Sequence, residues 1–299
     1  MLIYLSKVKK EYKQQKMKNS RTFSFIIVAL TYIVATLIGL VVYGVLPFEW
    51  WLNLFIADFV ATAVVFCVSI AVNNSSVYDP YWSVQPIVIL FALAIDKGLN
   101  LSSALVLVAV TFWGIRLTAN WAYTFQNLNW QDWRYSMLKQ KTKIFYPIVN
   151  FLGIHLFPTV VVYLCVLPAA YLIITKPQFN FFALFGALIV LFGSLLQGVA
   201  DVQMHKYRKN RVGNFIRTGL WKHSRHPNYL GEITVWWGVA IACVFTVGGA
   251  YHLCLGAIVN TLMFLFVSIP MADKRQSKKA GFEEYKKQTR MLFPIPKKI

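Results

Sequence analysis

Charged residues are scarce in this chain, and acidic ones are scarcer still. Only 14% of the 299 residues are charged, and 11 Asp and Glu face 30 Lys and Arg, which gives a net charge of +19. Soluble domains are usually about a quarter charged, whereas 58% of this sequence is hydrophobic. The composition therefore leaves no room for a large soluble domain and predicts a membrane protein.

Cysteine is also rare. The four cysteines, Cys67, Cys165, Cys243 and Cys254, lie in apolar runs, and their spacing fits neither a disulfide framework nor a metal site. The histidines show no metal-ligand spacing either. We expect the cysteines to be small core residues and expect no bound metal. The sequence also lacks the internal repeat that is typical of secondary transporters.

Apolar runs long enough to cross a bilayer recur along the whole chain. These runs are continuous rather than alternating, which argues against a β-barrel, and open sheet edges would be unsatisfied in lipid. Gly248 and Gly249 divide the last run into two helices. We therefore predict an all-α, polytopic transmembrane helical bundle of about 7–8 spans. The spans are Phe23–Leu46, Trp51–Val72, Ser83–Ile95, Leu101–Tyr123, Ile144–Thr175 and Phe181–Val202, with Ile233–Ile269 split in two.

Basic residues gather at the head of the chain, at Arg134–Lys143, at Lys206–Arg225 and at Lys274–Lys298. Such clusters beside apolar runs are typical of cytoplasmic loops, which explains them better than nucleic-acid binding does. We therefore expect both termini to be cytoplasmic and expect no nucleic-acid partner. The same charges predict a multi-pass membrane protein whose basic loops face the cytoplasm. The first run is too long for a cleavable signal peptide.

One predicted inner loop, residues 73–83, is not basic but is rich in hydroxyl and amide groups. A turn between two helices would account for Asp79-Pro80, and an interfacial position would account for Tyr81-Trp82. Functional side chains concentrate in loops, so Asp79 and Tyr81 are also the predicted catalytic, proton-handling residues. Both interpretations stay open for this loop.

The stretch Gly219–Glu232 (GLWKHSRHPNYLGE) concentrates polar residues between two apolar runs. Pro227 suits the first turn of a helix. The free amides and partial positive charge of that helix would face the loop before it and form an anion site. Arg225 can hold a phosphate with two parallel hydrogen bonds, and Arg208 and Arg217 come from the preceding segment.

Four-residue spacing places Asn228, Glu232 and Trp236 on one face of this predicted helix. Polar groups are costly in a bilayer and are usually functional there. Glu232 could accept hydrogen bonds from ligand hydroxyl or carboxamide groups, and Asp201 could bind another polar part of the same ligand. The alternative for Asp201, Asn228 and Glu232 is an internal polar network that locks helices together. Their position beside a basic loop favours the ligand site.

The last basic segment, Asp273–Pro294, also has two interpretations. One is an amphipathic helix at the membrane surface followed by a solvated tail. The other is a lid that folds over a bound nucleotide and contacts it through Tyr285 or Arg290.

These motifs resemble the C-terminal domain of the steroid 5-alpha-reductase family. They are most similar to its bacterial branch, known as a domain of unknown function within the isoprenylcysteine methyltransferase-like superfamily. The resemblance implies an all-helical membrane enzyme that binds NADPH from the cytosolic side and reduces a carbon–carbon double bond in a hydrophobic steroid-like, enone or lipid substrate. The residues that carry it are Asp201 with Arg208, Gly219–Trp221, Ser224–Glu232, Phe282–Tyr285 and Pro294, and upstream Tyr78–Trp82, Trp113–Leu117 and Asp132–Tyr135.

Motifs and resemblance together define the expected organisation. Residues 1–22 would form a basic cytoplasmic segment and residues 23–299 a single membrane-embedded reductase-like domain, with the cofactor-binding half at about 180–299. The expected partners are membrane lipids and a hydrophobic small-molecule or lipid substrate. The resemblance to the bacterial branch also implies a bacterial inner (plasma) membrane, with the site facing the cytoplasm. The predicted cofactor-binding residues are Asp201, Arg208, Arg217, Arg225, His226, Asn228, Tyr229, Glu232 and Tyr285.

Two other functions stay open. S-adenosylmethionine-dependent membrane methyltransferases of the isoprenylcysteine or phospholipid type share an Arg-His-Pro-x-Tyr-x-Gly pattern, which residues 225–231 also satisfy. S-adenosylmethionine carries no phosphate, whereas NADPH carries several, so the cations of residues 206–225 favour the reductase. The third possibility is a non-catalytic lipid-binding membrane protein that retains the fold.

Overall fold

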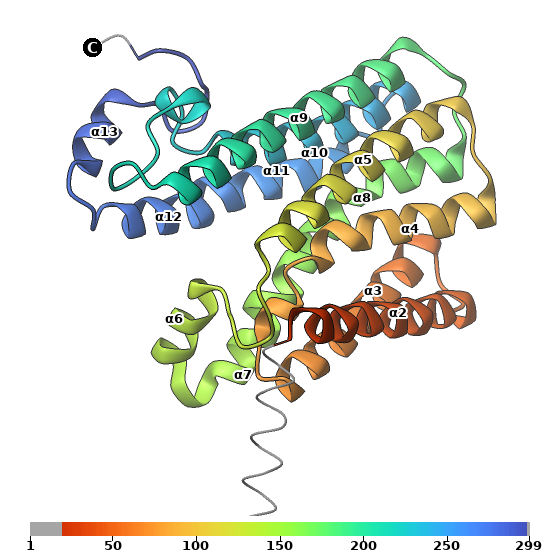
Figure 1. Ribbon diagram of the computed structural model, residues 1–299. Coiled ribbons are helices and arrows are strands. Elements are labelled where there is room, and N and C mark those ends of the chain that lie inside the picture. Colours follow the sequence, from red (N-terminus) through yellow and green to blue (C-terminus); the bar gives the residue numbers. More distant parts are fainter. Residues whose placement is uncertain (1–19, 298–299) are drawn as a thin grey trace, which may run out of the picture. The chain divides into compact units, whose positions relative to one another are not determined.

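The computed structural model describes residues 20–297, and in this part of the chain every regular element is a helix (Figure 1). The only extended pairing among these residues is an isolated bridge between Ser224 and Arg290. The prediction of an all-α polytopic membrane protein is therefore confirmed. Most of the predicted basic segment 1–22 lies outside the described residues.

The helices follow one another with short connections. Two of the segments, η3 and η6, are π-helical, and the other η segments are 3₁₀ turns. The first half of the chain contains α2 (Arg21–Val45), α3 (Trp50–Ala71), η1 (Ser75–Val77), α4 (Tyr81–Lys97), α5 (Leu101–Thr124), α6 (Trp133–Thr142), η2 (Lys143–Phe145), α7 (Tyr146–Val149) and η3 (Asn150–Leu156). The second half contains α8 (Phe157–Thr175), α9 (Phe181–Asn210), η4 (Gly219–Lys222), α10 (Pro227–Val247), η5 (Tyr251–Cys254), α11 (Leu255–Met263), η6 (Phe264–Ser268), α12 (Ile269–Gln276) and α13 (Phe282–Gln288).

Seven helical stretches among the described residues are long and apolar enough to cross a membrane. Seven of the eight predicted spans correspond to them. The predicted span Ser83–Ile95 corresponds to α4, which has only 17 residues and contains Pro86. A helix of that length is at the lower limit for a full crossing. The seven stretches are Arg21–Val45, Trp50–Ala71, Leu101–Thr124, Trp133–Thr175, Phe181–Asn210, Pro227–Val247 and Tyr251–Gln276.

Local sequence explains several helix ends. Asn180 begins α9 because its side-chain oxygen accepts hydrogen bonds from the first backbone amides. Pro227 is the first residue of α10, as predicted. Gly248 ends α10 with a φ of 74°, a left-handed conformation that glycine adopts without steric cost. The predicted division of the last apolar run at Gly248 is therefore confirmed.

The chain forms two compact units, each built from segments far apart in sequence. The first unit contains the described part of residues 1–88 together with Thr118–Tyr163, and the second contains Ile89–Leu117 and Leu164–Ile299. The predicted catalytic residues belong to the first unit, and all predicted cofactor-binding residues belong to the second.

Within the second unit, α9 and α10 lie side by side along most of their length (Figure 1). Glycines allow this close approach. A Cβ atom at Gly193 would lie 2.7 Å from the backbone oxygen of Gly231, and one at Gly231 would lie 2.6 Å from that of Gly193. Small residues at helix contacts let backbones approach in membrane proteins. This contact positions the polar residues of α9 against those of α10.

Candidate functional site

A buried carboxylate lies at the centre of the second unit. Glu232 of α10 is only 2% exposed, and its two oxygens accept three hydrogen bonds. The donors are Trp113 Nε1 and Gln197 Nε2 at 3.0 Å, and Trp236 Nε1 at 2.9 Å. The predicted face that carries Glu232 and Trp236 is therefore confirmed, and it points into the protein. Three N–H donors allow the carboxylate to be buried without leaving it unsatisfied.

The network continues along α9 through an arginine. Arg116 of α5 donates to the side-chain oxygen of Gln197 and forms an ion pair with Asp201 at 2.9 Å. The side chain of Asn228 also bonds to Asp201, and the charge of Arg208 lies close enough to interact with that carboxylate. The network thus joins α5, α9 and α10 and connects Asp201 to Glu232.

The partners of Glu232 are those of an internal network that fixes helices together, which was the alternative interpretation of the sequence. Asp201 and Asn228 are both partly exposed, whereas Glu232 is enclosed. If a ligand reaches this network, it contacts the Asp201 end. Glu232 then acts indirectly, because it holds Gln197 and through it the orientation of Arg116.

A second cluster lies just before α10. Arg225 forms an ion pair with Asp273 of α12 at 3.1 Å and donates to the backbone oxygen of Thr289 at 2.8 Å. The Nε2 atom of His226 lies 2.9 Å from the same carboxylate, and the His226 ring stacks on Tyr229 with centroids 5.2 Å apart. The two predicted ligands Arg225 and His226 therefore hold Asp273 in this structure.

The segment around α13 packs on the loop before α10, next to that cluster (Figure 1). The Tyr285 hydroxyl donates to the backbone oxygen of Trp221, and burial raises the pKa of this phenol. Arg217 lies over the rings of Phe215 at 4.5 Å and Tyr285 at 5.7 Å, and donates to the backbone oxygen of Gly281 at 2.7 Å. The predicted contacts of this segment are thus made with the protein itself.

Cations gather where α9 ends and α12 is followed by a turn. The pKa of Lys279 lies below its ordinary value because of partial burial and because Arg275, Arg211 and Arg208 are close to it. Like charges held together are unfavourable unless an anion joins them. Arg208 and Arg211 form no ion pair with a carboxylate in the described part of the chain. This cation cluster (Arg208, Arg211, Arg275 and Lys279) is suited to binding a phosphorylated ligand.

The two predicted catalytic residues have separate partners in the first unit. The hydroxyl of Tyr81 donates to Asp58 Oδ1 at 2.9 Å. Asp79 accepts a hydrogen bond from the Tyr135 hydroxyl at 2.5 Å. Burial raises the pKa of Asp79 to about 6, although the charge of Arg134 opposes the rise. A carboxyl group with this pKa is partly protonated near neutral pH and can exchange a proton there.

The sequence was compared with known families, curated proteins and solved structures. The model of the family described as "Protein of unknown function (DUF1295)" matches residues 65–289. The chain belongs to this family.

An uncharacterized protein of Schizosaccharomyces pombe is 28% identical to this DUF1295 protein in an alignment of 207 residues that covers 60% of each chain. The chain thus spans about 60% of the length of that curated relative. No solved structure is significantly similar to this DUF1295 protein. The matched range includes every predicted site residue from Asp79 to Tyr285.

Sequence reasoning missed several residues that the structure places in these clusters, among them Asp58, Arg116, Asp273 and Lys279. Asp58 is the only charged residue in the predicted span Trp51–Val72, and Arg116 is the only one in Leu101–Tyr123. A lone charge inside a span is a signal of function that could have identified both. Asp273 and Lys279 gave no comparable signal, because their partners are far away in the sequence.

Proposed function

We propose that this DUF1295 protein is a membrane-embedded, NADPH-dependent reductase of a carbon–carbon double bond in a hydrophobic substrate. The observation that carries the proposal is the cation cluster, which holds Arg208, Arg211, Arg275 and Lys279 close together. An adenine dinucleotide phosphate brings several negative charges and would relieve this repulsion. The resemblance of the late motif to the steroid 5-alpha-reductase family supports the same cofactor.

The residues present fit such a cofactor. Arg208 and Lys279 would bind its phosphates, and the partly exposed Asp201 and Asn228 would bind its hydroxyl or carboxamide groups. NADPH, when bound, supplies the hydride for the reduction. The basic end of α9 would face the cytoplasm under the positive-inside rule.

The predicted catalytic residues Tyr81 and Asp79 would provide the accompanying proton in this scheme. The Tyr81 hydroxyl is oriented by Asp58, whose other oxygen accepts a hydrogen bond from Gln85. If its one hydroxyl proton turned from Asp58 to a substrate carbonyl oxygen, Tyr81 would polarise that oxygen. Asp79, with its raised pKa, is the alternative proton source. Asp58 is a positioning residue in this scheme.

The first test is ligand binding to the full-length protein in detergent, measured by thermal shift and calorimetry. A ligand that binds only the folded state raises its apparent stability. We expect stabilisation by NADPH, less by NADH and none by S-adenosylmethionine. Stabilisation by S-adenosylmethionine alone would reassign the protein to methyl transfer. Failure of all three with folded protein would favour a non-catalytic lipid-binding protein.

Variants locate the binding. We expect Arg208→Ala and Lys279→Ala each to weaken NADPH binding about tenfold, the usual effect of losing one charge-assisted hydrogen bond. Lys206→Ala is the matched control, because Lys206 is exposed on the same helix and is not one of the cations acting on Lys279. Equal losses in Lys206→Ala and Arg208→Ala would show only general attraction of anions to a basic surface.

The proton donor is tested separately. Tyr81→Phe should abolish reduction of a lipid enone while leaving NADPH affinity unchanged. Asp58→Asn should lower the turnover rate and shift its pH profile if Asp58 positions the Tyr81 hydroxyl. Retained turnover in Tyr81→Phe would leave Asp79 as the donor to be tested next.

A further inference from the structure

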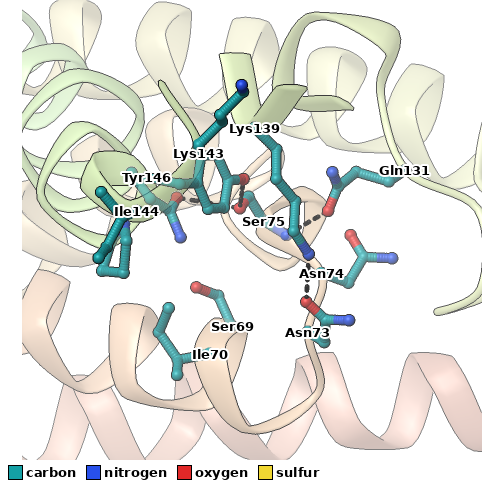
Figure 2. Close-up of a pocket in the computed structure, with 12 residues that line it drawn as sticks. Ser69, Ile70, Asn73, Asn74, Ser75, Gln131, Lys139, Lys143, Ile144 and Tyr146 are labelled. Carbon is teal, nitrogen blue, oxygen red and sulfur yellow. Dashed lines mark hydrogen bonds between the residues drawn. The ribbon is translucent and has the colours of Figure 1, made fainter. Parts of the chain in front are cut away.

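The first unit contains a polar cavity of about 360 Å³ that the proposed reaction does not use (Figure 2). Ligand pockets in proteins are typically ~300–1,000 Å³. The cavity lies between the end of α3, the loop that follows it, and the segment from α6 to η3. None of the twelve lining residues is acidic. They are Ser69, Ile70, Asn73, Asn74, Ser75, Gln131, Lys139, Lys143, Ile144, Tyr146, Pro147 and Asn150.

Two lysines reach this cavity without a carboxylate partner in the described part of the chain. Lys139 Nζ donates to Asn73 Oδ1 at 2.8 Å and lies 5.7 Å from the centre of the Tyr146 ring. Lys143 lines the cavity and is exposed. In Figure 2 the Lys139 side chain reaches Asn73, whereas the end of the Lys143 side chain extends away from the other labelled residues. The charge of the cavity is therefore positive, and no carboxylate among the described residues pairs with it.

The acceptor atoms of the cavity are already engaged by the protein. Asn150 Oδ1 accepts from the Ser75 hydroxyl at 2.9 Å. Gln131 Oε1 accepts from the backbone amide of Ser75 at 3.0 Å. Asn73 Oδ1 is the acceptor of Lys139. A ligand that offered donors would find few acceptors left.

The groups left over are donors. Asn150 and Gln131 bond to Ser75 through their side-chain oxygens, Asn150 Oδ1 and Gln131 Oε1, which leaves their amide N–H groups as the available donors at the cavity. A ligand with several acceptor oxygens and a negative charge would bond to these amides and to Lys143 together.

The backbone at the cavity is strained. Lys143 has φ 46° and ψ −112°, a conformation that residues with a side chain rarely adopt. Asn73 has a positive φ of 52° as well. Strain of this kind persists only where the surrounding structure enforces it, and it concentrates at ligand sites. Lys143 carries this strain at a position that lines the cavity.

The edge of the cavity is apolar. Ile70 is 46% exposed and Ile144 is 84% exposed, and the exposed Phe145 and Ile148 extend this surface along η2 and α7. In a membrane protein such side chains face acyl chains. The cavity therefore joins an anion-binding interior to a lipid-facing border, as an amphiphile with a phosphate headgroup requires.

We propose that this cavity binds the phosphate group of an anionic phospholipid through Lys139, Lys143, Asn150 and Gln131, with the acyl chains along Ile70 and Ile144. This binding is independent of the reductase activity and of NADPH. It would anchor α6 to the end of α3 in the membrane.

Binding is tested by native mass spectrometry of the full-length protein with phosphatidylglycerol or phosphatidylcholine. We expect a preference for phosphatidylglycerol in the wild-type protein and a loss of about tenfold or more in affinity in Lys139→Gln/Lys143→Gln. Lys141→Gln is the matched control, since Lys141 is exposed on the same helix and does not line the cavity. Asn150→Asp, which puts a carboxylate among the donors, should also abolish the preference.

Several outcomes would overturn the proposal. The wild-type protein could show no preference for phosphatidylglycerol, or Lys141→Gln could lose as much binding as the double variant, which would indicate a general surface charge effect. Inorganic phosphate or glycerol 3-phosphate that displaced the lipid with equal affinity would show a soluble ligand instead. The lysine variants alter exposed side chains, so the test does not depend on whether Asn150→Asp folds.

Discussion

The polar groups of the two units are satisfied in different ways. In the second unit, the Glu232 carboxylate takes up N–H donors from three other side chains, all at 2.9–3.0 Å. In the first unit, the cavity beside α6 has its amide oxygens bonded internally, which leaves the amide N–H groups of Asn150 and Gln131 as available donors. Glu232 belongs to a closed network, and Asn150 belongs to an open one.

This difference distinguishes residues that support the fold from residues that could bind a ligand. The late motif contains the densest polar sequence of the chain, yet Arg225, His226, Glu232 and Tyr285 mostly bind other parts of the protein. Groups with unused hydrogen-bonding capacity or unbalanced charge are better candidates for ligand contact. In the second unit these are Arg208 and Arg211, which form no ion pair with a carboxylate among the described residues, and in the first they are the donors at the cavity.

The largest expected effect is the loss of Glu232. In Glu232→Ala, two indole N–H groups and the Gln197 amide lose their acceptor in the protein interior. Each unsatisfied buried donor costs about 1–3 kcal/mol, so we expect a loss of at least about 3 kcal/mol and a large drop in thermal unfolding temperature. Glu283→Ala, at an exposed carboxylate, should leave that temperature unchanged.

A small effect of Glu232→Ala would break the comparison. It would mean that water or a ligand replaces the carboxylate, and that the network is open after all. Glu232→Gln should lower the unfolding temperature less than Glu232→Ala does, since it keeps one acceptor oxygen.

The next effect concerns the pair of Arg225 and Asp273. Asp273→Ala leaves Arg225 and His226 without their shared carboxylate. Breaking a largely buried pair of this kind lowers the free energy of unfolding by about 3 kcal/mol. Arg225→Ala should destabilise the protein by a similar amount if Arg225 is structural. If Arg225 instead binds the cofactor, Arg225→Ala will weaken NADPH binding much more than Asp273→Ala does. Calorimetry and thermal unfolding of both variants distinguish these cases.

Much of the fold could be predicted from local sequence. The start of α10 at Pro227, its end at Gly248, and the shared face of Asn228, Glu232 and Trp236 all depend on residues within a few positions of one another. Apolar length alone located the spans other than α4, which is too short to be identified as a span from its length. The number of crossings and the side of each terminus stay predictions.

The partners within the site could not be predicted in the same way. Arg116 and Asp201 are 85 residues apart, and their pairing depends on how closely glycine lets α9 approach its neighbours. From the sequence alone, the cations of residues 134–143 indicate a cytoplasmic loop. A sequence shows how many lysines a loop has, but not which of them line a cavity. Lys143 differs from Lys141 only through the fold.

A smaller effect follows from the pKa of Asp79, which rises from 3.8 to about 6. Because the folded state holds this proton more tightly than the unfolded state, the resulting stabilisation is complete below about pH 4 and is lost as the pH rises through 6. Relative to Asp79→Asn, the wild-type protein should therefore lose roughly 2–4 °C of unfolding temperature between pH 4.5 and 7.5. A flat difference for Asp79→Asn would mean that Asp79 is ionised throughout.

The smallest effect tests whether the open cavity is maintained at a cost in stability. Lys143→Gly removes a side chain from a backbone conformation that only glycine adopts easily, so it should stabilise the protein by about 1 kcal/mol while lowering its affinity for phosphatidylglycerol. Lys176→Gly is the matched control: Lys176 is exposed with a φ of 45° but does not line the cavity. It should raise the unfolding temperature to a similar extent without changing lipid binding. Higher stability in both variants, with lipid affinity lost only in Lys143→Gly, would show that the strain at Lys143 serves the cavity. Destabilisation by Lys143→Gly would instead show that the lysine supports the fold, as Glu232 does.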